Sequence, residues 1–212
     1  MFQLRCYNCH KGKGYSMDEI KILHYLQDNY LPKDCLYFAE RGQQLKIRPK
    51  ASSIPGFKPP LYYCCDGYSR MTFSYGLVSL GGKATVFIDP LTQKGTIFEI
   101  LGDYHHSNPQ FYKPDEISVK KASDGRMMTH KENFEYTMNR LKHIEEQGYK
   151  VFYIWVSDFR RFTRDLETKA DVHLFDYMNV EKKYHAEADY TLLPKGSQKY
   201  LTEIPRGITL EI

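Results

Sequence analysis

The most constraining feature of the sequence is an amphipathic helix that leads into a continuous apolar run. Thr129 and Glu132 form a capping box at the start of this helix, and Gly148 supplies a stop at its end. Its apolar face consists of Phe134, Met138, Leu141 and Ile144. The following run VFYIWV, residues 151–156, is typical of a buried central strand. A helix that delivers the chain into such a strand predicts an α/β fold, with a sheet flanked by helices.

Local signals also predict the elements of the first hundred residues. Ser16 and Glu19 form a second capping box, so we expect a helix that follows Ser16 and ends at Pro32. Residues 33–60 contain scattered prolines and predict a long surface loop, or a short strand plus loop. Residues 61–88 have a β-like composition, with a plausible hairpin turn at Gly81–Gly82.

A strand–turn–strand pattern occupies residues 84–101, and Asp89 followed by proline opens its turn. This pattern predicts that Asp89 and Glu99 lie on adjacent strand ends. Residues 107–128, which come next, predict a polar loop.

The composition excludes several classes of protein. The 212 residues are 42% hydrophobic and 26% charged, which excludes intrinsic disorder as the main theme. No apolar run approaches the roughly 20 residues that span a bilayer, and the first residues lack the apolar core of a signal peptide. We therefore expect an intracellular protein that is neither secreted nor bound to a membrane. The net charge of +4 is compatible with a nucleic-acid partner, and the 18 tyrosines include rings that could stack on bases.

Five cysteines without a signal peptide indicate a reducing compartment. Cys6 and Cys9 have the spacing of half a structural zinc site. The other half would need Cys64, Cys65 or His10, but adjacent residues on a strand face opposite sides. Buried free cysteines are the alternative interpretation.

The densest polar cluster is TIFEILGDYHHSNP, residues 96–109. A predicted strand carries Glu99, and its end carries Asp103, His105 and His106. Two carboxylates on adjacent strand ends suit a hard cation such as Mg²⁺, which can activate water and neutralise charge on a phosphate. A neighbouring histidine can exchange a proton with that water, because its pKa lies near working pH. Ordinary turn chemistry is the competing interpretation of the Asp-Pro and Gly-Asp pairs.

This cluster resembles a segment of phage and large-virus endonucleases, which are related to very-short-patch-repair nicking enzymes and to some homing endonucleases. In that family, part of the restriction-endonuclease-like PD-(D/E)xK superfamily, a Tyr-Glu-Phe strand precedes Gly-Asp, an aromatic residue and Trp-His-Gly-Asn-Pro. Two further blocks follow the family's order. Residues 14–26 resemble the first helix, whose metal-assisting Glu corresponds to Glu19, and residues 130–159 resemble the closing helix and strand. The resemblance covers roughly residues 12–160, apart from an insertion.

The sequence departs from the family pattern at three positions. His105 stands in the place of the tryptophan and Ser107 in the place of the glycine. Leu101 stands where the superfamily has a lysine two residues after the glutamate. His106 and Asp103 would then have to supply the missing polar function.

The resemblance also implies a metal-binding aspartate, which in the family commonly lies in an Asp-Gly-Tyr strand. Asp66 begins such a trimer, although it lies well upstream of Glu99. Asp89 is the alternative, but it matches the turn of the family rather than its ligand. We favour Asp66 and keep both as candidate metal ligands together with Glu99.

Candidate nucleic-acid contacts lie where basic residues alternate with aromatic ones. Lys113, Arg160 and Arg161 occupy such stretches, and lysine and arginine are the usual phosphate-binding residues. Thr137 and Arg140 match family positions on the second helix. Solvated surface positions and helix ion pairs are the alternative explanation for these residues.

These observations together predict a restriction-endonuclease-like α/β core with a mixed central sheet flanked by helices. The predicted core is 16–165 with an insertion at about 45–85, preceded by a basic cysteine-containing segment, 1–15, and followed by an extension, 166–212. The resemblance implies a DNA endonuclease that depends on Mg²⁺ or Mn²⁺. The alternative is a catalytically degenerate nucleic-acid-binding or structural subunit with the same fold.

Overall fold

The computed structural model describes residues 16–31, 34–39, 44–76, 85–89, 94–169 and 172–184, with backbone alone for 72–76 and 85–89. Two compact units divide the chain, and each is described by itself. The first comprises Met1–Gly102 and Glu135–Glu181, and the second comprises Asp103–Phe134 and Lys182–Ile212. No helix in the described ranges is long and apolar enough to cross a membrane.

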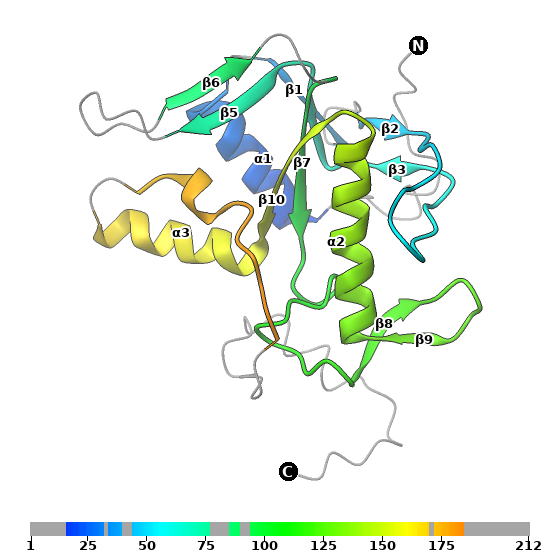
Figure 1. Cartoon of the computed structure of the whole chain (residues 1–212). Helices are drawn as coiled ribbons and strands as arrows, with labels where there is room; N and C mark the ends of the chain where they lie inside the picture. Colours follow the sequence, from blue (N-terminus) through cyan, green and yellow to red (C-terminus); the bar gives the residue numbers. More distant parts are fainter. Residues whose placement is uncertain are drawn as a thin grey trace. The chain divides into compact units, whose positions relative to one another are not determined.

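A four-stranded sheet forms the centre of the first unit (Figure 1). Its order is β1 (Leu36–Phe38), β4 (Gly67–Ser69), β7 (Thr96–Leu101) and β10 (Lys150–Trp155). The pairs β1–β4 and β4–β7 are antiparallel, whereas β7–β10 is parallel. The prediction of an α/β protein with a mixed central sheet and flanking helices is therefore confirmed.

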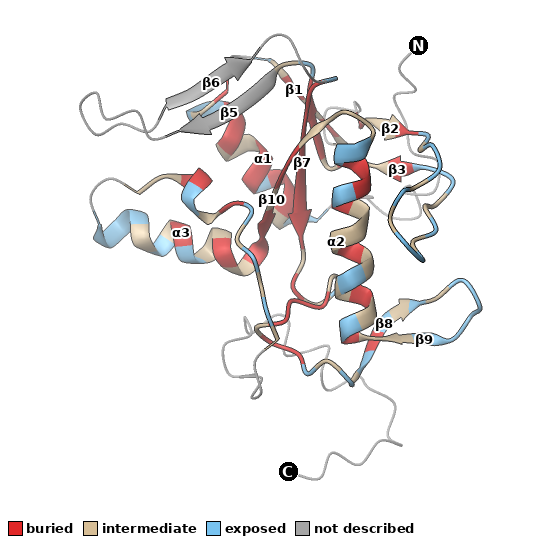
Figure 2. Cartoon of the chain, in the orientation of Figure 1, coloured by how far each residue is buried: buried red, intermediate tan, exposed pale blue. Residues whose placement is uncertain are grey.

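Strand β7 is buried along its whole length, as the continuous red of Figure 2 shows. The apolar run of β10 predicted a central strand, but β10 lies at one end of the strand order. Its apolar composition has another cause, because helices cover both faces of this sheet. Phe152 and Ile154 pack in a cluster with α1 (Met17–Asn29), while the opposite face carries Glu99, which binds α2 (His130–Glu146).

Both predicted capping boxes are present. Ser16 Oγ accepts a hydrogen bond from Glu19 N at 3.0 Å, and Ser16 N donates to the Glu19 carboxylate at 3.3 Å. Thr129 and Glu132 make the same reciprocal pair at the start of α2. Gly148 follows the end of α2 at a φ of +91°, in the left-handed region that favours glycine.

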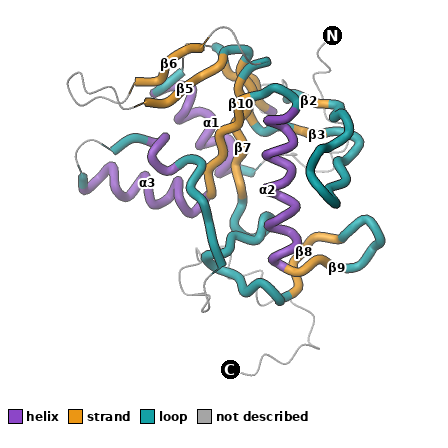
Figure 3. The backbone as a smooth tube through the Cα atoms, in the orientation of Figure 1, coloured by secondary structure: helices purple, strands orange, loops and turns teal. Residues whose placement is uncertain are grey.

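Among the described residues, three further sheets have two strands each (Figure 3). In the first unit β2 (Lys46–Ile47) pairs with β3 (Tyr63–Cys64), and β5 (Thr72–Gly76) pairs with β6 (Thr85–Asp89). The β-like prediction is confirmed for the described residues of 61–88, whereas residues 77–84, including the turn at Gly81–Gly82, lie outside the described ranges. The prediction that Asp89 and Glu99 lie on adjacent strands is wrong. Among the described strands, β6 pairs only with β5, and β7 pairs with β4 and β10.

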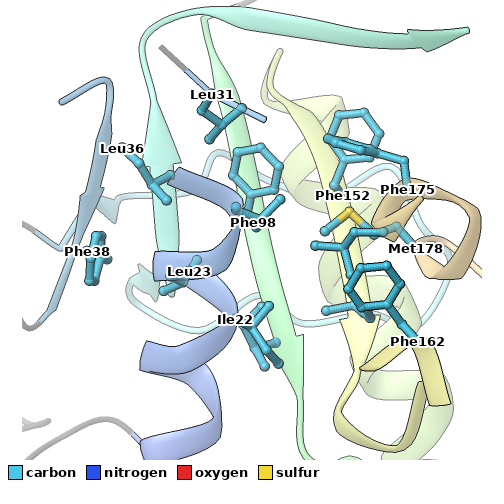
Figure 4. Close-up of a cluster of buried hydrophobic side chains, with 14 of the residues drawn as sticks. Ile22, Leu23, Leu31, Leu36, Phe38, Phe98, Phe152, Phe162, Phe175 and Met178 are labelled. Carbon is cyan, nitrogen blue, oxygen red and sulfur yellow. The ribbon is translucent and has the colours of Figure 1, made fainter. Parts of the chain in front are cut away.

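The stretch after β10 forms α3 (Val156–Thr168), and the 3-10 helix η3 (Leu174–Tyr177) follows it. Phe162 of α3 is buried in the main hydrophobic cluster, which also contains side chains from α1, the sheet and η3. In this cluster Phe98 stacks on Phe152 with 5.7 Å between ring centroids, and Phe175 meets Phe152 edge-on at 5.3 Å (Figure 4). The cluster fixes α1 and α3 against the same face of the sheet.

The second unit contains an antiparallel hairpin of β8 (Ile117–Lys121) and β9 (Met127–Thr129). The prediction of a polar loop over 107–128 is wrong for this part. Gly125 lies in the turn of the hairpin with a φ of +88°. Beside it, Ala122 N donates a hydrogen bond to Arg126 O at 2.8 Å. In β8 the apolar residues Ile117 and Val119 are exposed and Ser118 is buried, so the polarity of the sequence does not mark the buried face of this strand.

Candidate functional site

Three carboxyl groups from distant parts of the sequence gather in the first unit. Glu19 lies in the first turn of α1, Asp66 directly precedes β4, and Glu99 is in the middle of β7. The register of β4 on β7 places Gly67 opposite Phe98, so Asp66 continues this register beside Glu99. One oxygen of Asp66 accepts a hydrogen bond from the backbone N–H of Ile100 at 2.8 Å, which fixes the carboxyl at this strand.

Gly67 explains how α1 comes close enough to add Glu19. A Cβ atom at Gly67 would meet Leu23 Cδ2 at 2.6 Å and Phe98 Cβ at 3.3 Å. Glycine therefore allows α1 to approach the sheet closely at this point. Leu23 follows Glu19 by about one helical turn, so both side chains lie on the same face of α1. The close packing of this face on the sheet brings Glu19 near Asp66 and Glu99.

Arg140 of α2 supplies a positive charge to this cluster. Its guanidinium donates to both oxygens of Glu99, at 2.8 and 3.0 Å, and also to the backbone carbonyl of Cys64 at 2.9 Å. The Glu99 side chain is 3% exposed and that of Arg140 is 15% exposed. Burial opposes the positive charge, but the neighbouring Glu99 carboxylate raises the pKa of Arg140 above its ordinary value. The arginine is thus held permanently charged.

One arginine does not balance three carboxyl groups. Burial, together with the charge of Glu99, raises the pKa of Glu19 to about 7, although its bond to the Ser16 backbone acts in the opposite direction. Burial and the charges of Glu99 and Glu19 raise the pKa of Asp66 well above its usual range. Glu19 is buried, and none of the described residues gives its Oε1 atom a hydrogen bond. Protons bound to Glu19 and Asp66 therefore offset the charge that the single arginine does not balance, and one carboxyl oxygen of Glu19 stays unsatisfied.

The donors in this cluster are carboxylate oxygens, the ligand type that Mg²⁺ and Mn²⁺ prefer. No group of three or more His, Cys, Asp or Glu side chains in the described ranges is arranged to hold a metal ion as they stand. Glu99 gives one lone pair of each oxygen to Arg140, and each carboxylate oxygen has a second lone pair for another partner. The donor chemistry therefore fits a hard cation, while the cluster would need local rearrangement to enclose one.

The second unit holds the remaining predicted catalytic residues. Asp103 is buried and accepts a hydrogen bond from the Asn108 side chain at 2.6 Å, which closes the loop between them. His105 is exposed, with its ring edge-on to Tyr104, and His106 is partly buried. These residues and the carboxyl cluster belong to different units, so joint action of His106 with Glu99 stays a prediction.

A buried polar network in this loop was missed by sequence reasoning. Ser107 has a φ of +57°, and its hydroxyl lies 2.8 Å from His130 Nδ1 and accepts a hydrogen bond from Asn133 Nδ2 at 2.7 Å. The His130 ring stacks on Tyr112 with 4.4 Å between centroids, and burial lowers the pKa of His130 to about 4. The signal in the sequence was the serine itself, which occupies a position where the resembled family has glycine.

The predicted nucleic-acid contacts occupy different environments. Lys113 is exposed, whereas Thr137 is buried in α2 and Arg140 is engaged by Glu99. Arg160 pairs with Asp18 at 2.9 Å, and Arg161 pairs with Asp158 at 3.2 Å, with both arginine side chains partly accessible.

Three other candidates fall outside what the structure describes. Cys6 and Cys9 lie outside the described residues, so the structural zinc site stays a prediction. The side chain of Asp89 is likewise undescribed, whereas Asp66 lies beside Glu99. Cys65, a candidate for the other half of the zinc site, is buried, and this burial raises the pKa of its thiol.

Comparison with known proteins produced no match, whether with family models, with curated proteins or with solved structures.

Proposed function

We propose that the protein is a metal-dependent DNA endonuclease with a restriction-endonuclease-like core. The observation that carries this proposal is the gathering of Glu19, Asp66 and Glu99, with one buried carboxyl oxygen of Glu19 left unsatisfied. Burying several carboxyl groups around one arginine is costly unless another cation compensates them. A divalent cation fits the oxygen donors and would take the place of the protons that the raised pKa values of Glu19 and Asp66 imply.

Each residue has a role in this proposal. Asp66 and Glu99 would hold the cation at the junction of β4 and β7, and Glu19 would orient a water molecule beside it. A bound Mg²⁺ supplies charge neutralisation for a phosphate and lowers the pKa of water. Arg140 stands in for the lysine that the superfamily pattern would put at Leu101, because it provides the cation that contacts Glu99.

The loop after β7 gives the resemblance separate support. Ser107 occupies the glycine position of the family segment and adopts a positive φ of +57°, a conformation that glycine adopts without strain. The backbone at Ser107 thus has a conformation that glycine would adopt without strain. His106, which occupies the position of the family's histidine, is the proposed proton-transfer residue.

A second candidate function is a nucleic-acid-binding subunit with the same fold and no activity. The bidentate Glu99–Arg140 ion pair favours this candidate, because it neutralises the central carboxylate without any metal. The absence of lysine at Leu101 also favours it.

A cleavage assay distinguishes the two functions. Supercoiled plasmid and single-stranded DNA would be incubated with Mg²⁺, Mn²⁺ or EDTA and the full chain. We expect metal-dependent cleavage by the wild type and by Asp89→Asn, and none by Glu99→Gln or Asp66→Asn. Asp89→Asn is the matched control, since it removes the same charge from the alternative candidate ligand. Equal loss in the two aspartate variants would contradict the assignment to Asp66, and binding without cleavage of any substrate would favour the inactive subunit.

A further inference from the structure

A long loop, teal in Figure 3, joins β2 to β3. The charges of this segment are of one sign. Residues 44–65, which contain both strands and the loop, carry four basic side chains and no acidic one. The whole chain carries 30 basic and 26 acidic residues, so the two signs are nearly balanced elsewhere. A one-sign stretch of this kind concentrates positive potential on one part of the surface. The four basic residues are Lys46, Arg48, Lys50 and Lys58.

The loop also exposes apolar surface next to its basic side chains. Leu61 is 71% exposed and Tyr62 is 37% exposed. The Lys46 ammonium lies 4.1 Å from the centroid of the Tyr62 ring, so a cation and an aromatic face are presented together. Arg48, Lys50 and Lys58 are exposed as well.

Contacts with α2 and with Gln147, the residue after it, hold the loop in place. Lys50 N donates to Gln147 Oε1 at 3.0 Å, and Ser53 Oγ donates to a carboxylate oxygen of Glu146 at 2.7 Å. The Phe57 ring packs against Tyr136 and His143, with centroids 5.5 and 5.7 Å apart. A loop that is already ordered loses less conformational entropy when it binds a partner.

The end of the loop leads directly into the carboxyl cluster. Cys64, whose carbonyl accepts the hydrogen bond from Arg140, ends β3, and Asp66 follows two residues later. The exposed residues Leu61 and Tyr62 therefore lie within five residues of the proposed metal-binding aspartate in the sequence. We propose that the β2–β3 loop binds DNA. Arg48, Lys50 and Lys58 contact backbone phosphates, while Leu61 and Tyr62 contact base edges in a groove of the duplex.

A nucleic acid offers partners for both kinds of side chain on this surface, the basic ones and the apolar or aromatic ones. Phosphates take lysine and arginine, with release of counterions, and apolar or aromatic side chains can wedge against base steps or stack on bases. The choice of DNA rests on the proposed function. Binding by the loop does not require the carboxyl cluster, so an experiment can refute the loop proposal and the endonuclease proposal independently.

The test compares two triple variants of the full chain by fluorescence anisotropy with a labelled DNA duplex, in EDTA, from 50 to 200 mM salt. The first variant is Arg48→Gln/Lys50→Gln/Lys58→Gln. The matched control, Lys21→Gln/Arg164→Gln/Lys169→Gln, removes three exposed charges elsewhere in the first unit. Both lower the net charge from +4 to +1.

We expect the loop variant to bind about tenfold or more weakly at low salt, with the slope of log K against log salt reduced by about 3. The control variant should retain the wild-type slope. Equal effects of the two variants would overturn the proposal, because they would reflect net charge alone. Tighter binding of an RNA duplex of the same sequence would overturn the assignment to DNA.

The exposed leucine tests the apolar part of the surface. Leu61→Ser should weaken binding without changing the salt slope, because the slope counts phosphate contacts only. Unchanged affinity would overturn the role of Leu61. A plasmid cleavage assay then separates the proposals: loop-dependent binding without cleavage would refute the endonuclease alone, and cleavage with loop-independent binding would refute the loop alone.

Discussion

The guanidinium of Arg140 binds both carboxylate oxygens of Glu99, at 2.8 and 3.0 Å, across 41 residues of sequence. The pair joins α2 to the middle of β7, and both side chains are largely removed from water. In such a place each charge depends on the other, because water can no longer solvate the one that is left alone. The pair therefore has a structural role whatever reaction the cluster performs.

Removing one partner of this pair should be strongly destabilising. Arg140→Met leaves the Glu99 carboxylate buried without its cation, so we expect a loss of about 3–5 kcal/mol in the free energy of unfolding. The double variant Arg140→Met/Glu99→Met should recover most of that loss, since it leaves no unpaired charge. Urea denaturation of the four forms gives the coupling energy of the pair.

The exposed ion pair between Arg126 and Glu132 is the control for this experiment, with 2.6 Å between the closest charged atoms. Arg126→Met should leave the denaturation midpoint almost unchanged, because water solvates the remaining carboxylate. A loss as large as that of Arg140→Met would contradict the assignment of the effect to burial.

Glu19 should make stability fall between weakly acidic and neutral pH. Its folded pKa of about 7 lies above the ordinary value of 4.5, so the folded protein holds a proton that the unfolded chain releases. That contribution is complete below about pH 4.5 and is lost as pH rises through about 7, with a size on the order of 2–3 kcal/mol. Glu19→Gln should remove this part of the pH dependence and be more stable than the wild type at pH 8.

The same variant tests the proposed metal site without an activity measurement. Mg²⁺ should raise the melting temperature of the wild type at pH 8, by mass action on the folded state. The rise should be smaller in Glu19→Gln, which lacks the unsatisfied carboxylate. Equal shifts in the two proteins would count against a role for Glu19 at the cation.

His130 should impose the opposite pH dependence. Burial lowers its pKa from 6.5 to about 4, so the unfolded chain binds a proton that the folded protein excludes. Its contribution to stability is complete above about pH 6.5 and is lost as pH falls through about 4, on the order of 3 kcal/mol in total. NMR titration of the imidazole would measure the pKa directly. A value near 6.5 in the folded protein would contradict the prediction.

Ser107 presents a choice between backbone strain and hydrogen bonding. Ser107→Ala keeps the φ of +57° and removes the hydroxyl that contacts His130 and Asn133, so we expect a loss of about 1–3 kcal/mol. Ser107→Gly removes the same hydroxyl but relieves the backbone, and should be about 1 kcal/mol less destabilised than alanine. Thermal denaturation would establish the order. A glycine variant less stable than the alanine variant would show that strain at this position is negligible.

Several features of the fold could be predicted from the sequence because they depend on neighbours in the chain. Ser16 with Glu19, and Thr129 with Glu132, form their capping boxes through contacts three residues apart. The left-handed stop at Gly148 is equally local. The β8–β9 hairpin escaped prediction because β8 exposes its apolar residues Ile117 and Val119 and buries Ser118, the reverse of the usual strand pattern.

The sequence likewise indicated some residues of the candidate site but not the contacts between them. The Asp-Gly-Tyr trimer identified Asp66, but the sequence did not explain why glycine follows it. The structure gives the reason in the approach of Leu23 from α1. The motif predicted that Arg140 contacts nucleic acid, whereas in the structure Arg140 forms a buried ion pair with Glu99.

By itself, the sequence determined where the two capped helices begin, which segments are apolar enough to become strands, and that helices accompany a sheet. Only the tertiary structure decided that β7 pairs with β4 and β10 rather than with β6, and that Glu19, Asp66 and Glu99 meet around one arginine. The physical reason is that caps and periodic patterns depend on residues a few positions apart. Strand order and buried charge pairs depend on the packing of the whole core, which no local pattern specifies.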